Sequence, residues 1–468
     1  MDPNYYKTAY MELESKIAKI AKYKLRDFIK YMAGGVTPRI TEGDKYYANE
    51  KVGVPFLRVQ NLSPEGLDCS ECKYINEDTH NGLLKRSQVC EGDLLIKITG
   101  VGRMAITSIA PKGFKGNINQ HIVVIKSKDP ELNCQIAAFL NSDVGEMLAT
   151  HRTTGGTRPA LDYKALRSIP IVLNKKIQLI MEEAYKIKKE KIAEAHKILG
   201  TIDDYLLGEL DICMVKKSND IFQNRLFYVD SLNLLGGRFD PNKYSLKYKE
   251  IYEAVEKSRF KHILLKDLIT DKISGNWGMD DTEKNEKLIK CLTIRATEFD
   301  NNYNLNLDNS RLKYRRYEES VYKKIRLKCN DILIEKSGGS NEQPVGRVAI
   351  INEEILNSND SPLTFSNFIY KIEIDREQAC PEYIFEYLSL MHSLKLTESM
   401  QSQTNGIRNL IMDEYLNQTV LLPDVKIQKK IVEKTESIRK QAKLLENEAE
   451  NIVKKAQNEV KKILLGGE

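Results

Sequence analysis

The chain has 468 residues, of which 41% are hydrophobic, and a formal net charge of +6. This length allows more than one domain, and no apolar run approaches the ~20 residues that a membrane-spanning helix needs. The first residues lack a basic segment followed by an apolar one, and the 8 cysteines have no regular spacing, so we expect a cytoplasmic protein without a signal peptide. The mild positive charge permits an anionic partner without requiring one.

Short motifs recur in the same order in the two halves of the chain. An Asp-Pro-Asn turn, a turn with an apolar strand, a Gly-Arg pair and a Gly-x-Arg triplet occur at residues 2–4, 91–96, 102–103 and 156–158, and again at 240–242, 329–334, 346–347 and 406–408. Solenoid and propeller repeats have periods of roughly 20–50 residues, so this much longer repeat predicts duplication of a whole domain.

Each half is predicted to begin with a short amphipathic helix, at residues 5–20 and 244–255, and to continue with short strands between turn residues. The expected strands lie at 54–59, 93–98 and 121–126 in the first half, and at 291–295, 331–335 and 368–374 in the second. A further helix follows in each half, at 133–148 and 381–400.

A long helix is predicted to close each half. In the second, apolar residues from Ile427 to Ile463 keep an alternating three- and four-residue spacing, which predicts a coiled-coil seam. The first has a weaker seam from Ile177 to Ile198, which we extend towards Leu210. Its expected partner is the other long helix; two surface helices, each packed on its own domain, are the alternative.

The predicted fold is α+β, with two similar mixed α/β domains separated by two long antiparallel coiled-coil helices in a pseudo-twofold internal repeat. The first domain would span residues 1–174 and the first spacer helix 175–212. A connector and the second domain would span 213–424, and the second spacer helix 425–468.

The doubled order of these elements resembles the DNA-specificity subunit of type I restriction-modification systems. That family has an Asp-Pro-x-x-Tyr-like opening turn, matched at 2–6 and 240–244, and a Gly-Asp strand followed by a Gly-Arg turn, matched at 92–96 and 102–103. Its domains end in a Gly-rich loop and a Pro-flanked strand, matched at 155–171 and 405–423. The resemblance covers essentially the whole chain, although the Pro-Leu-x-Glu-Gln start of the family's long helices is reduced here.

The resemblance implies a non-catalytic subunit that reads double-stranded DNA. Each domain would contact one half of a split site, and the paired helices would set the gap between the halves. Two methyltransferase subunits would dock on the helices and methylate adenine with S-adenosylmethionine, and motor-nuclease subunits can join. The chain itself would hold no cofactor.

The alternative is a catalytic DNA methylase or nuclease with a duplicated body. A methylase needs a loop with two prolines before an aromatic residue, and the turn at 2–5 lacks the second proline. The nearest nuclease set is Asp331, Glu335 and Lys336, but adjacent residues of a strand point to opposite faces. The sequence therefore favours a non-catalytic DNA-binding subunit over an enzyme.

A zinc site is the other chemical possibility. A loosely spaced group of possible zinc ligands lies in the first half, at Cys69, Cys72, His80 and Cys90. Because the second half has no counterpart, we favour unliganded thiols in a surface loop and predict no metal.

The duplication also predicts which residues contact DNA. Residues that both copies share cannot distinguish two different half-sites, so Arg103 with Arg347, and Arg158 with Arg408, are assigned to phosphate contacts or to the fold. Base reading is expected where the copies differ and where Arg suits guanine, Asn or Gln suits adenine, and Thr suits the thymine methyl group. The candidates are Thr37, Arg39, Arg58, Gln60, Asn61, Asn119, Gln120, His121, Arg152, Thr153 and Thr154 in the first copy, and Asn276, Trp277, Thr293, Arg295, Ser366, Asn367, Gln403 and Thr404 in the second. Any one of them could instead be a solvated loop residue, and Trp277 could belong to a domain core.

Overall fold

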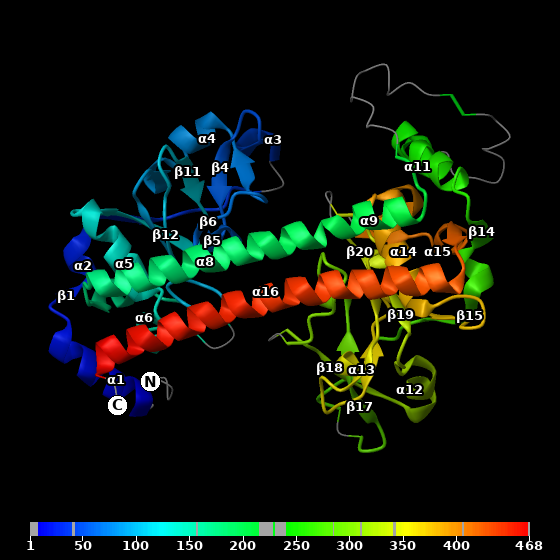
Figure 1. Cartoon of the computed structure of the whole chain (residues 1–468). Helices are drawn as coiled ribbons and strands as arrows, with labels where there is room; N and C mark the ends of the chain where they lie inside the picture. Colours follow the sequence, from blue (N-terminus) through cyan, green and yellow to red (C-terminus); the bar gives the residue numbers. More distant parts are fainter. Residues whose placement is uncertain are drawn as a thin grey trace. The chain divides into compact units, whose positions relative to one another are not determined.

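The computed structural model describes residues 8–39, 43–155, 158–214, 228–229, 240–283, 285–308, 311–339, 343–404 and 407–466. Helices and mixed sheets make up this part of the chain, so the expected α+β class is confirmed (Figure 1). The chain divides into two compact units. Unit 1 comprises Met1–Ala195 and Lys443–Glu468, and unit 2 comprises His196–Ala442.

Unit 1 contains two larger sheets. The first is antiparallel, in the order β10 (Thr107–Ile109), β9 (Leu94–Lys97), β12 (Ile122–Ser127) and β2 (Ile29–Gly34). The second has the order β3 (Tyr47–Ala48), β7 (Lys73–Ile75), β4 (Val54–Leu57), β11 (Lys115–Ile118) and β8 (Gln88–Cys90), with β4 parallel to β11. Smaller pairs are β1 (Tyr23–Lys24) with β13 (Pro170–Ile171), and β5 (Leu62–Ser63) with β6 (Gly66–Leu67). The shorter helices are α1 (Thr8–Ile20), α2 (Leu25–Phe28), α3 (Gly43–Tyr46), α4 (Glu77–Asn81), α5 (Asn133–Leu140), α6 (Asp143–His151) and α7 (Tyr163–Ser168).

The central strand β9 is buried on both faces. Leu94 and Ile96 lie in the core covered by helices, whereas Leu95 lies in the core that the second sheet shares. Successive side chains of a strand point to opposite faces, so a strand covered on both sides is apolar throughout. The continuous apolar run in the sequence follows from this position.

Unit 2 repeats the strand order of the first sheet. It has β21 (Val348–Ile350), β19 (Ile332–Glu335), β23 (Ile369–Ile374) and β15 (Ile269–Ser274), all antiparallel. A second sheet has the order β16 (Met279–Asp280), β18 (Tyr314–Tyr317), β17 (Ile289–Ile294) and β22 (Leu363–Phe365), with β17 parallel to β22. The remaining strands are β14 (Lys261–Leu264) with β26 (Thr419–Leu422), and β20 (Ser337–Gly338), β25 (Ile407–Leu410) and β24 (Gln401–Thr404). The shorter helices are α11 (Leu246–Glu256), α12 (Glu319–Ile325), α13 (Glu353–Leu356), α14 (Pro381–Ser393) and α15 (Met412–Leu416).

All six expected strands are confirmed, but the two helices that follow them are shorter than predicted. The first breaks between α5 and α6, where the Ser142 side chain accepts a hydrogen bond from Gly145 N and starts a new helix. The second ends at Ser393, because Lys395 adopts a left-handed φ of 62° before a short 3-10 turn. Both segments are helical as predicted, but each predicted helix is interrupted inside its range by residues that end one helix or start the next.

The long helices are α8 (Lys175–Leu199), α9 (Thr201–Glu209) and α16 (Val425–Leu465); α16 is coloured red in Figure 1. Within unit 1, α8 and α16 run antiparallel, since Lys191 pairs with Glu448 at 2.5 Å and Tyr185 lies 3.5 Å from Gln457. Within unit 2, Lys430 of α16 pairs with Glu209 of α9 at 2.7 Å.

The buried face of α16 differs in detail from the expected seam. Ile431, Ile438 and Ala442 are buried, as the three- and four-residue spacing predicts. That spacing would place Lys434 in the seam between Ile431 and Ile438, but Thr435 is buried instead. The lysine remains exposed because burying an ammonium group without a partner is costly. No helix in the described ranges is both long and apolar enough to cross a membrane.

Candidate nucleic-acid interface

Four segments of unit 1 meet beyond one end of its first sheet. Gly35 N donates to Ile122 O at 3.4 Å, and Ile98 N donates to His121 O at 3.0 Å. Leu161 N donates in turn to Ile98 O at 2.8 Å, and Thr99 bridges to Ala160. These bonds join the turn after β2, the turn before β12, the segment after β9 and the segment before α7.

The joined segments bring together Thr37, Gln120, His121 and Arg158, which we call the unit 1 face. The Thr37 hydroxyl donates to the Gln120 amide oxygen, and Gln120 Nε2 lies 3.3 Å from His121 Nε2. Burial, and then the positive charge of Arg158, lower the pKa of His121 below 6.5. Arg158 and Gln120 are exposed, so the face presents a cation beside amide and hydroxyl groups.

Unit 2 joins the corresponding segments in the same way. Gly275 N donates to Ile369 O at 3.0 Å, and Lys336 N donates to Phe368 O at 2.8 Å. Leu410 N donates to Lys336 O at 2.8 Å, and Gly338 pairs with Arg408 of β25.

This arrangement places polar and aromatic groups on what we call the unit 2 face: Asn276, Trp277, Lys336, Asn367 and Gln403. Asn276, Asn367 and Gln403 are exposed, and Lys336 Nζ donates to Ser274 Oγ at 2.8 Å. Trp277 is half-buried, and the Arg315 guanidinium lies 4.3 Å from its ring centre. Trp277 therefore is not a core residue, and it carries a cation on one face.

Lys336 and Arg315 are not among the residues that the sequence predicts to contact DNA. Arg315 belongs to a basic and aromatic run at residues 313–317, which is visible in the sequence. Such a run is a usual sign of nucleic-acid contact, so it could have been selected.

The paired arginines Arg103 and Arg347 are bonded inside their own units. Arg103 contacts Asp143 at 3.1 Å and Glu146 at 3.4 Å, so it holds the segment after β9 against α6. Arg347 makes two hydrogen bonds of 2.9 Å to Glu335, whose side chain is 1% exposed. Both arginines thus support the fold, the second of the two roles expected for them.

Several expected base readers are also held inside the structure. Arg152 pairs with Glu14 of α1 and donates to Ser168 Oγ at 3.1 Å. Asn61 is 2% exposed, and its amide bonds to Arg58 N at 2.8 Å and Asp68 O at 2.9 Å. Their polar atoms are directed to protein partners in this structure, and base reading by either residue stays a prediction.

Arg58 and Arg295 occupy matching turns that follow β4 and β17. Arg58 donates to Glu71 O at 3.2 Å, and Arg295 pairs with the buried Glu298 at 2.6 Å. Thr293 and Ser366 are 1% and 0% exposed, so neither can meet a base edge without a change of fold. Asn119 is buried and accepts from His121 N at 3.1 Å, and Thr153 donates to Thr150 O at 2.7 Å.

The other candidates lie at the surface or outside the described residues. Arg39, Gln60 and Thr154 are exposed, and Arg408 is half-buried. The side chain of Thr404, the Asp-Pro-Asn turn at 2–4, and the glycines at 156 and 406 lie outside the described residues.

The groups considered for catalysis are each paired with another residue. Asp331 lies 3.5 Å from Lys371 Nζ, Glu335 is bonded to Arg347, and Lys336 is bonded to Ser274. The three side chains that came nearest to a nuclease set therefore have separate partners.

Two of the residues considered for a zinc site, the less favoured alternative, are similarly engaged. The His80 ring bonds to Asn117, and burial raises the pKa of the Cys72 thiol to about 12, which opposes the thiolate that zinc needs. Among the described residues, no group of three or more His, Cys, Asp or Glu side chains is arranged to hold a metal ion.

Comparison with known proteins gives one family. Residues 279–454 match the family described as type I restriction modification DNA specificity domain, and no curated protein matches the chain. Those residues contain β16 to β26 and most of α16.

Three solved structures are similar at low identity. The type I restriction-modification system S subunit from M. genitalium is 13% identical, with 92% of this chain and 94% of that chain covered and a TM-score of 0.36. The HsdS subunit from Thermoanaerobacter tengcongensis is 12% identical, with 95% and 96% covered and a TM-score of 0.29. A chain from a structure on complex assembly of the type I R-M system is 12% identical, with 95% and 97% covered and a TM-score of 0.39. Similarity at this level carries no argument about function. The family match rests on residues 279–454, which are similar to type I restriction modification DNA specificity domains.

Proposed function

We propose that the chain is a sequence-specific DNA-binding specificity subunit that directs partner adenine methyltransferase subunits to a bipartite site in double-stranded DNA. The observation that carries this proposal is the match of residues 279–454 to the DNA specificity domain family. The shared strand order of the two antiparallel sheets supports a second, duplicated DNA-reading domain in unit 1. Such a subunit acts in the cytoplasm, where it meets the chromosome.

The unit 1 face and the unit 2 face are the proposed DNA contacts. Arg158 and Lys336 suit phosphate oxygens, because sequence-independent contacts come chiefly from cations. Gln120, Asn276 and Asn367 are exposed amides of the type that reads adenine in the major groove. One face would read each half-site.

The long helices are proposed to form an antiparallel coiled coil in a pseudo-twofold subunit. The pairing of Lys191 with Glu448 in unit 1, and of Lys430 with Glu209 in unit 2, supports that direction. Two methyltransferase subunits would dock on these helices and carry S-adenosylmethionine, and motor-nuclease subunits could join the complex. This chain would take no part in catalysis and would hold no cofactor.

The test is selection of binding sites from a pool of random DNA duplexes with the full chain and its methyltransferase partner. We expect a motif in two parts separated by an unselected gap. Asn276→Ala with Asn367→Ala should change one part alone, and Thr37→Ala with Gln120→Ala the other. An undivided motif would contradict the proposal, as would methyl transfer from labelled S-adenosylmethionine by the purified chain without a partner.

A further inference from the structure

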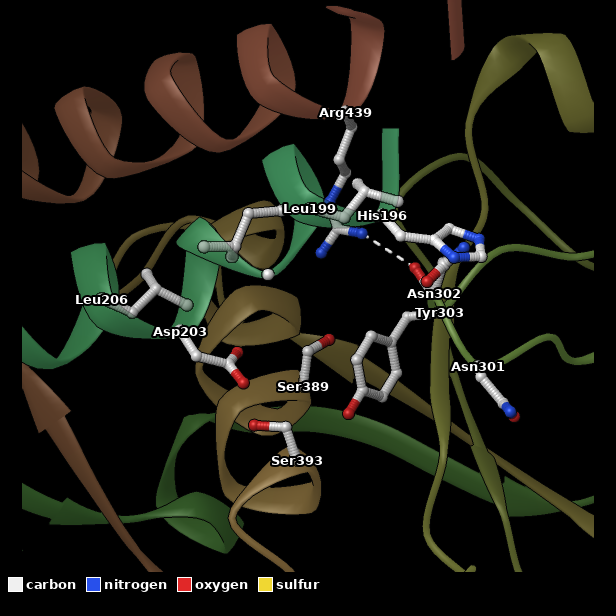
Figure 2. Close-up of a pocket in the computed structure, with 12 residues that line it drawn as sticks. His196, Leu199, Asp203, Leu206, Asn301, Asn302, Tyr303, Ser389, Ser393 and Arg439 are labelled. Atoms are coloured by element: carbon white, nitrogen blue, oxygen red, sulfur yellow. Dashed lines mark hydrogen bonds between the residues drawn. The ribbon is translucent and has the colours of Figure 1, made fainter. Parts of the chain in front are cut away.

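A pocket of about 440 Å³ lies within unit 2. Its walls come from the end of α8, from α9, from α14 and from the loop at residues 301–303, with Arg439 of α16 at one side (Figure 2). Pockets of roughly 300–1,000 Å³ are the usual size for small ligands. The proposed DNA-binding function makes no use of this one.

One side of the pocket offers hydrogen-bond acceptors. In Figure 2 the side chains of Asp203, Ser389, Ser393 and Tyr303 lie in one part of the pocket, and the oxygens of Asp203 and Ser393 point toward each other. The Ser389 hydroxyl donates to Phe385 O at 2.8 Å, and the Ser393 hydroxyl donates to Leu390 O at 2.9 Å. With its hydrogen used inside α14, the Ser389 hydroxyl can accept from a ligand. The Ser393 hydroxyl also forms a hydrogen bond with the Asp203 carboxylate, and the lone pairs of its oxygen can accept from a ligand.

Tyr303 is fixed as an acceptor by the residue behind it. His392 Nε2 lies 3.1 Å from Pro344 O, so this nitrogen carries the proton. Burial lowers the pKa of His392 to about 4, and the neutral ring then accepts at Nδ1 from the Tyr303 hydroxyl at 3.0 Å. Tyr303 has a φ of 65°, which a bulky residue rarely adopts, and the backbone is held in this form where the ring enters the pocket.

The pocket has a surplus of negative charge. Arg439 donates to Glu386 at 2.9 Å and to Asn302 O at 2.8 Å, so Glu386 balances its charge. Burial raises the pKa of Asp203, and the nearby carboxylate of Asp204 adds to the rise, whereas the hydrogen bond from Ser393 and the more distant charge of Arg439 act in the opposite direction. A ligand cation beside Asp203 would lower that pKa again.

Aliphatic side chains also line the pocket. They are Leu199, Ile202 and Leu206, and Leu206 is 1% exposed. Acceptors with a carboxylate beside aliphatic side chains match a hydrocarbon chain that ends in an ammonium group. Charged donors favour such acceptors because hydrogen bonds between ions are about twice as strong as neutral ones.

We propose that this pocket binds a small aliphatic amine, with its ammonium group between Asp203, Ser389 and Ser393 and its hydrocarbon chain against Leu199 and Leu206. The ligand would tie α9 to α14 inside unit 2. This site is additional to the proposed DNA-binding function, and its test does not depend on DNA.

The test is a calorimetric titration of the full chain with 1,4-diaminobutane. The matched probe is 1,4-butanediol, which has the same length and no charge. We expect saturable one-to-one binding of the diamine, with the diol roughly tenfold weaker or more. Asp203→Asn should weaken diamine binding by roughly tenfold or more. Glu256→Gln, which removes the charge of an exposed carboxylate of α11, should leave it unchanged.

Ser393→Ala is a second variant, used in case Asp203→Asn unfolds. It removes one acceptor and should lower the affinity for the diamine several-fold. Thermal unfolding of each variant without ligand shows whether it is folded. Equal binding of diamine and diol would overturn the proposal, and so would non-saturable binding. Unchanged affinity in the folded Asp203→Asn chain, or in Ser393→Ala if the former is unfolded, would overturn it as well.

Discussion

Arg152 and Arg158 stand in one short stretch of the chain but have different surroundings. Arg152 is 15% exposed and bonds to Glu14, whereas Arg158 is exposed beside His121. We predict that Arg152→Ala lowers the free energy of unfolding by about 2 kcal/mol, because Glu14 loses its charged partner. Urea denaturation measures the loss.

Arg158→Ala is the matched variant, and it should leave the unfolding curve unchanged. It should weaken DNA binding for all sequences alike and reduce the slope of log K against log salt by about one unit. If Arg158→Ala instead alters the preferred base at one half-site while affinity holds, Arg158 is a base reader.

We predict that His121 makes the proposed DNA binding depend on pH. Burial and Arg158 hold its pKa below 6.5, and neighbouring phosphates would raise it by favouring the charged ring. Binding then takes up a proton, so affinity should increase as the pH falls through about 7 to 5.5. The measurement is the dissociation constant against pH at fixed salt.

The controls for this pH dependence are two histidine variants. His121→Asn should flatten the profile, and His196→Asn, an exposed histidine of unit 2, should keep it. A profile that keeps its slope in His121→Asn would assign the proton to another group.

At the level of elements, a glycine ends the edge strand of each first sheet. A Cβ on Gly35 would lie 1.8 Å from Ile118 O, and a Cβ on Gly275 would lie 2.2 Å from Ser366 O. The strand ends therefore pass directly against the backbone of the turns before β12 and β23, which carry Gln120 and Asn367. Close backbone approach of this kind requires glycine.

We predict that Gly275→Ala costs about 1–3 kcal/mol of unfolding free energy, since backbone must shift to admit the methyl group. It should also weaken DNA binding by displacing Asn276. Gly208→Ala is the control: no atom lies within 4 Å of its Cβ, and alanine in a helix stabilises by roughly 0.5–1 kcal/mol. Thermal unfolding and DNA binding of both variants check this, and equal stability of Gly275→Ala and the natural chain would show that the turn adapts.

At the level of the whole molecule, α16 contributes residues to both units. If the long helices set the gap between half-sites, their length should control it. Deleting residues 440–446 from α16 and 188–194 from α8 keeps the seven-residue spacing and retains Arg439 and His196 of the pocket. Each helix loses about 10 Å, or roughly three base pairs at 3.4 Å each.

The double deletion should recognise the same two half-sites with a shorter gap, or fail to bind. Methylome sequencing of cells that carry it with the partner methyltransferase measures the gap. Deletion from α16 alone is the control, and it should abolish binding because the two helices no longer match. An unchanged gap at full methylation would show that the length of the helices does not set the distance between the half-sites.

The sequence by itself determined the elements and their doubled order. Leu94 to Ile96 read as a strand and Ile427 to Ile463 as one helix because apolar spacing reflects local geometry. The resemblance to specificity subunits rested on that order, and the family match to residues 279–454 agrees with it.

Only the tertiary structure decided which candidate side chains remain at the surface. Arg152 and Arg158 look alike in sequence, but Arg152 meets Glu14, which lies 138 residues away along the chain. The pocket likewise joins Asp203 to Ser389 and Tyr303, which no spacing in the sequence relates. The spacing of residues along the chain determines which helices and strands form. The burial of a side chain and its bonding partners depend on segments that meet only when the whole unit packs.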